Sequence, residues 1–154
     1  MRRFTLLCCT AAFVACARTD QPADTTAAVA TPPPEPPPIM LSDVAGKWDV
    51  KGMAEGTDST VVTYVFNASA DTTGWTITFP NRRPIPVRVV SVAGDSITIA
   101  AGPFESVLRK GVQVRTTGPM RLRDGKLVGT VTARYATKRP DSVSILRTEG
   151  TRAP

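Results

Sequence analysis

Apolar and polar residues alternate with a period of two from Ser42 to the end of the chain, as they do in strands that bury one face. Turn-forming residues recur about every 8 to 12 positions, and no stretch of helical length repeats apolar residues at a spacing near 3.6. The alternation predicts eight strands, over residues 46–53, 60–67, 74–79, 85–92, 96–101, 112–123, 127–135 and 142–148.

A first hairpin is predicted around Asp124-Gly125, a pair that favours a two-residue turn. With this turn, Leu122 opposes Leu127 and Met120 opposes Gly129, so apolar residues share one face of the hairpin and the basic residues between them share the other. The turn chemistry and the polarity pattern therefore predict the same register.

A second hairpin is predicted around Gly94-Asp95 by the same reasoning. Val92 then opposes Ile97 and Val90 opposes Ile99, which places all four side chains on one face.

Eight antiparallel strands joined in order by hairpins favour an up-and-down barrel, because closure removes the exposed edges of an open sheet. A two-sheet β-sandwich is the alternative. Pro119 lies inside the sixth predicted strand and cannot donate a hydrogen bond to a neighbour, so we expect the sheet to open or bend there and the barrel to be incompletely closed.

The N-terminus carries a targeting signal. Arg2-Arg3 precede an apolar stretch that is too short to span a bilayer as a helix. The stretch ends in Phe13-Val14-Ala15-Cys16, which resembles a bacterial lipobox, whereas Cys8 and Cys9 lack a preceding small residue. The resemblance implies a lipoprotein signal peptide over residues 1–15 and lipidation of Cys16. Simple secretion, with cleavage after a small residue, is the alternative.

Residues 16–41 are predicted to form a tether of the lipidated Cys16 and a Pro-rich linker, since a run such as Pro32–Pro38 favours an extended conformation and buries no core. Residues 42–154 form the barrel domain. We therefore expect a protein anchored to the membrane through its N-terminal lipid, at the outer membrane and facing the periplasm, or, if it is not lipidated, a soluble periplasmic or secreted protein.

The first predicted strand opens with Gly46-Lys47-Trp48, and the last contains Arg147 in phase with Val143 and Ile145. These residues resemble the calycins, the group of small barrels that includes lipocalins, avidin and fatty-acid-binding proteins. In lipocalins a Gly-x-Trp signature opens the first strand, and an Arg from the far end of the chain packs over that Trp. The resemblance implies a ligand-binding barrel in which Arg147 packs over Trp48, in an exported bacterial lipoprotein.

The residue types of enzymatic catalysis are scarce. The chain of 154 residues contains no His, and none of its three Cys lies beyond residue 16. Most acids sit beside turn-forming residues, and neither a phosphate-binding loop nor a nucleophile elbow is present. We therefore predict no catalytic residues, no metal site and no cofactor, and a protein that is not an enzyme.

Alternation predicts a set of bulky inward residues that would contact a ligand, Trp48, Tyr64, Phe66, Trp75 and Phe79, and the apolar Phe104 of the loop 102–111 is predicted to join them. Arg88 and Arg147 are predicted inward as well, the first in phase with Val90 and Val92. A buried guanidinium must be paired, either with the Trp48 ring and backbone carbonyls or with a ligand carboxylate. Both pairings stay open at the level of sequence.

Residues 102–111 form the longest predicted loop and include three large apolar side chains, so we expect the loop to fold over one end of the barrel, as a plug of the core or as a lid over a cavity. The formal net charge of +6 favours contact with an anionic envelope component or protein, and the export signal argues against nucleic acid. The leading hypothesis is binding of a small apolar or amphipathic molecule. The alternative is an interaction, inhibitor or scaffold module that acts through its basic face and loops.

Overall fold

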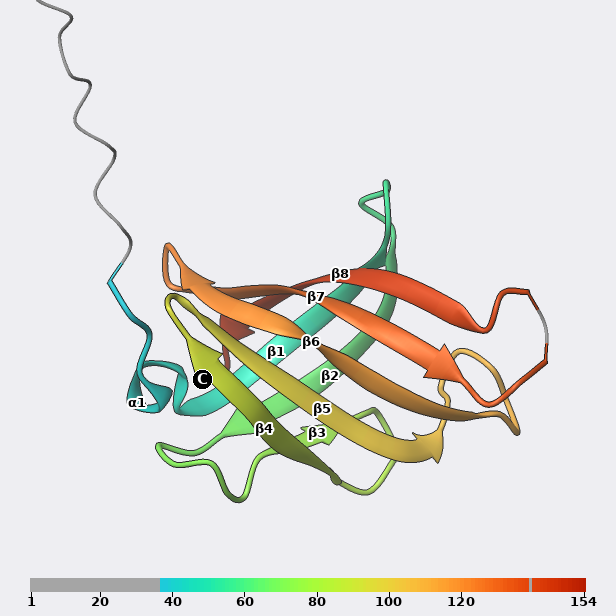
Figure 1. The fold of residues 1–154 in the computed structure, drawn as a ribbon, viewed down its shortest axis with the longest axis horizontal. Helices are drawn as coiled ribbons and strands as arrows, with labels where there is room; N and C mark the ends of the chain where they lie inside the picture. Colours follow the sequence, from blue (N-terminus) through green and yellow to red (C-terminus); the bar gives the residue numbers. More distant parts are fainter. Residues whose placement is uncertain (1–36, 139) are drawn as a thin grey trace, which may run out of the picture. The chain divides into compact units, whose positions relative to one another are not determined.

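The structure, a computed structural model, describes residues 37–138 and 140–154; the predicted signal peptide, Cys16, most of the linker and Arg139 lie outside this part of the chain. Eight antiparallel strands close into a barrel, which confirms the predicted fold class (Figure 1). The strands are β1 (Gly46–Ala54), β2 (Thr60–Ala68), β3 (Thr76–Thr78), β4 (Ile85–Ala93), β5 (Ser96–Glu105), β6 (Gln113–Arg123), β7 (Lys126–Tyr135) and β8 (Val143–Arg152).

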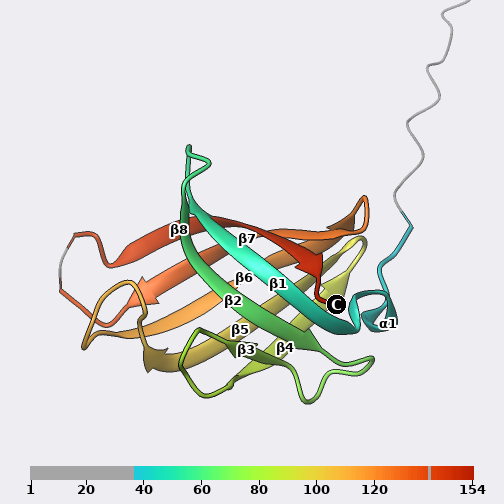
Figure 2. The ribbon, with the colours of Figure 1, turned by 180° about the vertical axis from the view of Figure 1, so that it is seen from behind.

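Each strand pairs with the next, and β8 pairs with β1 to close the ring. Figure 2 shows β8, β1 and β2 side by side on the wall opposite to β4 to β6. The pairing between β3 and β4 is the shortest in the barrel, since only Thr76 and Ile77 of β3 take part in it. No helix in the described part of the chain has the length and apolarity needed to cross a membrane.

The β6–β7 hairpin has the predicted register, with Leu122 opposite Leu127. Pro119 lies within β6 as expected, but the barrel stays closed around it. The break is local: the β6–β7 ladder lacks pairs at Gly118 and Pro119, where the two backbones come very close. A Cβ added to Gly118 would lie 1.8 Å from the carbonyl oxygen of Thr130, so only glycine fits there.

The β4–β5 hairpin is only partly as predicted. Val92 does oppose Ile97, but a bulge between Val89 and Ser91 shifts the register, so that Val89 rather than Val90 opposes Ile99. An extra residue in a strand reverses which side chains face inward on either side of it. Arg88 is therefore exposed on the outer wall, and the prediction that it points inward is wrong.

One end of the barrel, here named the packed end, is filled with side chains. Trp48, Trp75, Phe66, Ile97 and Val44 are fully buried there. The Phe66 and Trp75 rings meet edge to face with their centroids 5.5 Å apart, an arrangement that stabilises by about 1 kcal/mol beyond area burial. This end therefore holds the buried aromatic core.

The chain enters and leaves at this same end. Ile39 is buried in the core and its N–H donates to the carbonyl of Gly94 at 2.8 Å, so packing begins before the predicted boundary at residue 42. A single helical turn, α1 (Leu41–Val44), follows, and the carbonyl of Val44 accepts a hydrogen bond from Trp48 Nε1 at 2.8 Å. Figure 1 shows the C-terminus beside α1.

An arginine does pack over the Trp48 ring, but it is Arg152 and not the predicted Arg147. The Arg152 guanidinium carbon lies 4.4 Å from the ring centroid, and its two terminal nitrogens donate to the carbonyls of Ala45 and Asp43 at 2.8 and 2.9 Å. A Cβ added to Gly46 would lie 2.8 Å from Arg152 Nη1. The glycine of the Gly-x-Trp signature thus leaves space for the arginine that covers the tryptophan.

Arg147 lies on the outer face of β8, because Leu146, Thr148 and Gly150 are the residues of that strand that face inward. Its guanidinium pairs with Asp58 and lies 3.6 Å from the sulfur of Met53. The prediction of an inward Arg147 is wrong, since Val143 and Ile145, with which it is in phase, are themselves exposed.

Candidate functional site

The other end of the barrel, here named the open end, contains a cavity of about 70 Å³. Residues of β2 to β8 and of the segments that follow β3 and β5 line it, and in the described part of the chain no charged residue contributes to the lining. A void of this size exceeds the space of roughly 10–15 Å³ that one water needs. The interior therefore divides into a filled half and a hollow, apolar half.

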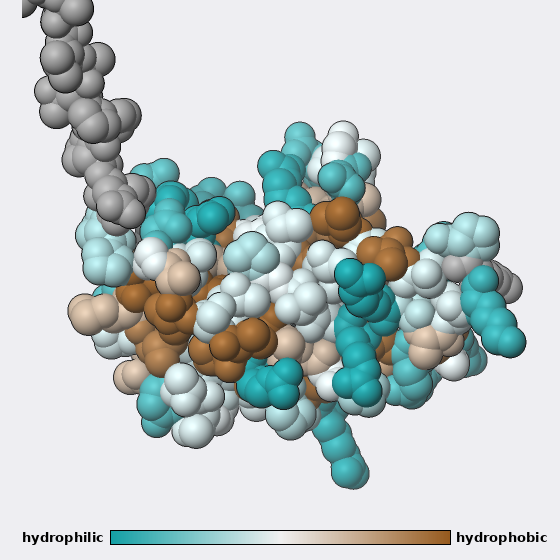
Figure 3. Space-filling model, viewed as in Figure 1, coloured by the Kyte–Doolittle hydropathy of each residue, from teal (hydrophilic) through white to brown (hydrophobic). Residues whose placement is uncertain are grey.

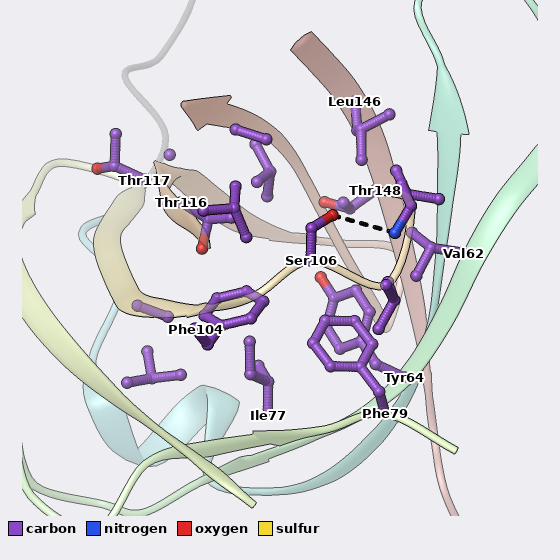
Figure 4. A pocket seen from close by; sticks show the side chains of 18 of the residues that line it. Val62, Tyr64, Ile77, Phe79, Phe104, Ser106, Thr116, Thr117, Leu146 and Thr148 are labelled. Atoms are coloured by element: carbon purple, nitrogen blue, oxygen red, sulfur yellow. Dashed lines mark hydrogen bonds between the residues drawn. The ribbon is translucent and has the colours of Figure 1, made fainter. Parts of the chain in front are cut away.

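Three aromatic rings form one wall of the cavity. The Tyr64 and Phe79 rings lie 5.6 Å apart between centroids, and Phe79 and Phe104 lie 5.8 Å apart. Figure 4 shows these rings and the Ser106 side chain turned toward the same space. Tyr64 comes from β2, Phe79 follows β3 and Phe104 lies near the end of β5, so the wall joins strands on both sides of the short β3.

Two hydroxyl groups give this apolar wall a polar element. Burial raises the pKa of Tyr64 above its usual value, so the phenol stays protonated and can donate a hydrogen bond. No described residue hydrogen-bonds to the hydroxyl of Tyr64 or to that of Thr148, although Thr148 is buried in β8, and neither oxygen is sealed from solvent. Both hydroxyls are available to a ligand.

A short connection covers the open end. β5 runs to Glu105, and the cover loop, residues 106–112, then leads to β6. Val107 and Leu108 line the cavity from this loop and are still 37% and 43% exposed. The predicted loop thus lies over one end as expected, shortened by the extension of β5.

The cover loop is held at Ser106 and at Arg109. The buried Ser106 hydroxyl oxygen accepts hydrogen bonds from the N–H groups of Leu108 and Arg109 at 3.1 and 3.0 Å. Arg109 stacks 4.0 Å from the centroid of the Tyr135 ring and pairs with Asp141 at 3.1 Å. Between these two residues, Val107 and Leu108 form an apolar tip, whose only hydrogen bond to a side chain among the described residues is that from the Leu108 N–H to Ser106 within the loop.

The predicted ligand residues fall into three groups. Tyr64, Phe79 and Phe104 line the cavity, and Trp48, Phe66 and Trp75 lie in or beside the filled interior of the packed end. Arg88 and Arg147 lie on the outer surface and do not contribute to the cavity. The structure thus brings three of the eight predicted ligand residues together at the cavity.

Sequence reasoning missed the part of the lining that β7 and β8 provide, including Tyr135, Leu146 and Thr148. No local sequence signal marks these residues, because their facing is set by the long-range pairing of Gly150 with Leu127, which brings Gly150 close to Val50 inside the barrel. An inward Gly150 places Thr148 and Leu146 inward by alternation.

Within residues 37–138 and 140–154, no group of three or more His, Cys, Asp or Glu residues is placed to hold a metal ion. Comparison of the chain with known protein families, with curated proteins and with solved structures found no match.

Proposed function

We propose that this protein binds one small, uncharged and mainly apolar molecule in the cavity at the open end, without transforming it. The observation that carries the proposal is a lining free of charged residues in the described chain, on which the Tyr64 and Thr148 hydroxyls stand without protein partners. Binding pockets for small molecules combine apolar walls with a few placed polar groups in this way. A ligand with one carbonyl or ether oxygen would accept a hydrogen bond from Tyr64.

The size of the cavity determines whether a guest can enter without movement of the cover loop. Pockets for drug-sized molecules measure about 300–1,000 Å³, so the 70 Å³ present here accommodates only a very small guest. A larger guest enters when the tip of the cover loop moves outward. Val107 and Leu108 are the residues that move, and this movement breaks the hydrogen bond from the Leu108 N–H to the Ser106 hydroxyl while Arg109 stays anchored to Tyr135 and Asp141.

Kinship with the calycins and attachment to the cell envelope belong to the same proposal. The closed barrel of eight strands supports that kinship, as does an arginine from the end of the chain over the Trp48 of a Gly-x-Trp signature. The lipobox-like sequence before Cys16 supports attachment to the envelope. The protein would hold its guest at the outer membrane, facing the periplasm.

The test is fluorescence titration of the purified protein with 1-aminoanthracene, an apolar probe that brightens on leaving water. Leu146→Trp fills the cavity from β8, and Ile145→Trp places the same side chain on the outer face one residue away. We expect saturable uptake that Leu146→Trp abolishes and Ile145→Trp preserves, with circular dichroism confirming that both variants are folded. No uptake, or equal loss in both variants, would contradict the proposal.

A second experiment tests the role of the Tyr64 hydroxyl. 2-Adamantanone and adamantane have nearly the same shape, but only the ketone accepts a hydrogen bond. If Tyr64 donates to the guest, Tyr64→Phe weakens displacement of the probe by the ketone about threefold to tenfold and leaves the hydrocarbon unchanged. Equal changes for the two competitors would assign Tyr64 a packing role only.

A further inference from the structure

We propose a second binding site on the outside of the barrel, for a phosphate-type polyanion. Arg88 of β4, Arg115 of β6 and Arg134 of β7 line one groove on the outer wall, with Ala100 and Thr117 between them. The three arginines do not line the internal cavity, although the two sites share one wall, since Thr117 lines both.

The three arginines differ from other basic residues on this wall because they have no protein partner in the described chain. Arg121 and Arg123, on the same outer face of β6, both pair with Asp95. By contrast, no described residue forms an ion pair, a hydrogen bond or a ring contact with Arg88, Arg115 or Arg134. Their charge remains available to a ligand.

The strand register places two of these charges face to face. Arg115 pairs directly with Arg134 across β6 and β7, an arrangement in which like charges repel and lower stability. Arg88 pairs with Ala100 of β5, which in turn pairs with Thr117 of β6. Arg88 therefore lies two strand spacings, about 10 Å, from β6. An anion in the groove would remove the repulsion that the fold itself leaves in place.

The groove exists because β5 carries no large side chain there. A bulge in β5 between Ala101 and Phe104 shifts the register, so Arg115 has no paired residue on that side. Gly102 turns at φ +100°, and a Cβ at this residue would lie 2.6 Å from the carbonyl oxygen of Val114. Figure 3 looks onto this wall and shows hydrophilic side chains projecting from it between paler residues.

The number of guanidinium groups selects the class of anion. Each presents a planar fork of donors that matches phosphate oxygens. A single carboxylate carries one charge and would leave most of the repulsion between Arg115 and Arg134. A phosphate monoester or pyrophosphate carries two or more negative charges and several acceptor oxygens on one or two neighbouring phosphorus atoms. Such an anion can therefore contact all three arginines.

The experiment follows the backbone amides of Ala100 and Thr117 by NMR while pyrophosphate is added to the purified protein. Arg115→Gln and Arg134→Gln remove charge from the groove, and Arg121→Gln removes the same charge from the same face of β6 outside it. We expect Arg115→Gln and Arg134→Gln to weaken binding about tenfold each, and Arg121→Gln to change it less than about twofold. Circular dichroism shows whether each variant is folded.

A second arm distinguishes the source of the phosphate. Vesicles of phosphatidylcholine with phosphatidic acid are compared with vesicles of phosphatidylcholine alone, in the same variants. Binding of pyrophosphate alone assigns the site to a soluble anion, and binding of the acidic vesicles with the same variant pattern assigns it to a lipid headgroup. The proposal is overturned if neither binds, or if Arg121→Gln weakens binding as much as Arg134→Gln, because charge alone would then explain the effect.

Discussion

The contact of Arg152 with Trp48 gives the sharpest test of how the packed end is stabilised. Arg152→Met keeps an apolar stem over the indole and removes the guanidinium. The substitution removes a cation–π contact at 4.4 Å to the fully buried Trp48 ring, which contributes about 1 kcal/mol. It also removes two hydrogen bonds from Arg152 to backbone carbonyls, which contribute about 0.5–1 kcal/mol each at an exposed site. We expect the free energy of unfolding to fall by about 2 kcal/mol.

Arg147→Met is the matched control, since it removes an arginine of the same strand. Its ion pair involves Asp58, whose side chain is 93% exposed, and surface pairs of this kind contribute about 0–1 kcal/mol. Urea unfolding followed by tryptophan fluorescence measures both variants, and thermal denaturation should show Arg152→Met melting roughly 6–10 °C below the wild type. If the two variants lost equal stability, the assignment of Arg152 as the residue that closes this end would be refuted.

Three further predictions concern single groups. The pKa of the Asp95 carboxyl is lowered, first by its hydrogen bond to Arg121 and then by that to Arg123. The ionised carboxyl therefore stabilises the folded protein above about pH 4, where it is also ionised in the unfolded chain, and this stabilisation is lost as the pH falls through the lowered pKa. Asp95→Asn should therefore be less stable than the wild type at pH 7 and converge with it in acid, and urea midpoints that differ equally at pH 7 and pH 2 would contradict this. Ser106→Ala removes the acceptor of two loop N–H groups, and faster hydrogen exchange at Leu108 and Arg109, with the β6–β7 hairpin unchanged, is the expected result. Gly118→Ala should lower the free energy of unfolding by about 1–3 kcal/mol because the new methyl meets the backbone of β7, and a wild-type melting temperature would show that the strands can separate there without cost.

The sequence predicted the hairpins because their register depends on local chemistry. Asp124 and Gly125 specify a two-residue turn, and Leu122 and Leu127 confirm its register by sharing a face, so every residue of that hairpin could be assigned a side. Predictions of this kind need no knowledge of distant strands.

The errors arose where alternation has no local reference. A bulge adds one residue without a signature in the apolar pattern, so Arg88 was placed on the wrong face. In β8 both faces carry apolar residues, Ile145 outside and Leu146 inside, and only the distant pairing of Gly150 with Leu127 decides between them. The contribution of β8 to the candidate site therefore depended on long-range register that sequence periodicity does not contain.

The position of the two chain ends has a practical consequence. Ile39 enters beside α1, and the N–H of Ala153 donates to the carbonyl of Lys47, so both ends of the described chain lie at the packed end. Immobilising the protein on a sensor surface, or fusing it to a reporter, through either end would leave the cover loop unobstructed. Measurements of guest uptake on such a surface would then report on the cavity and not on the attachment.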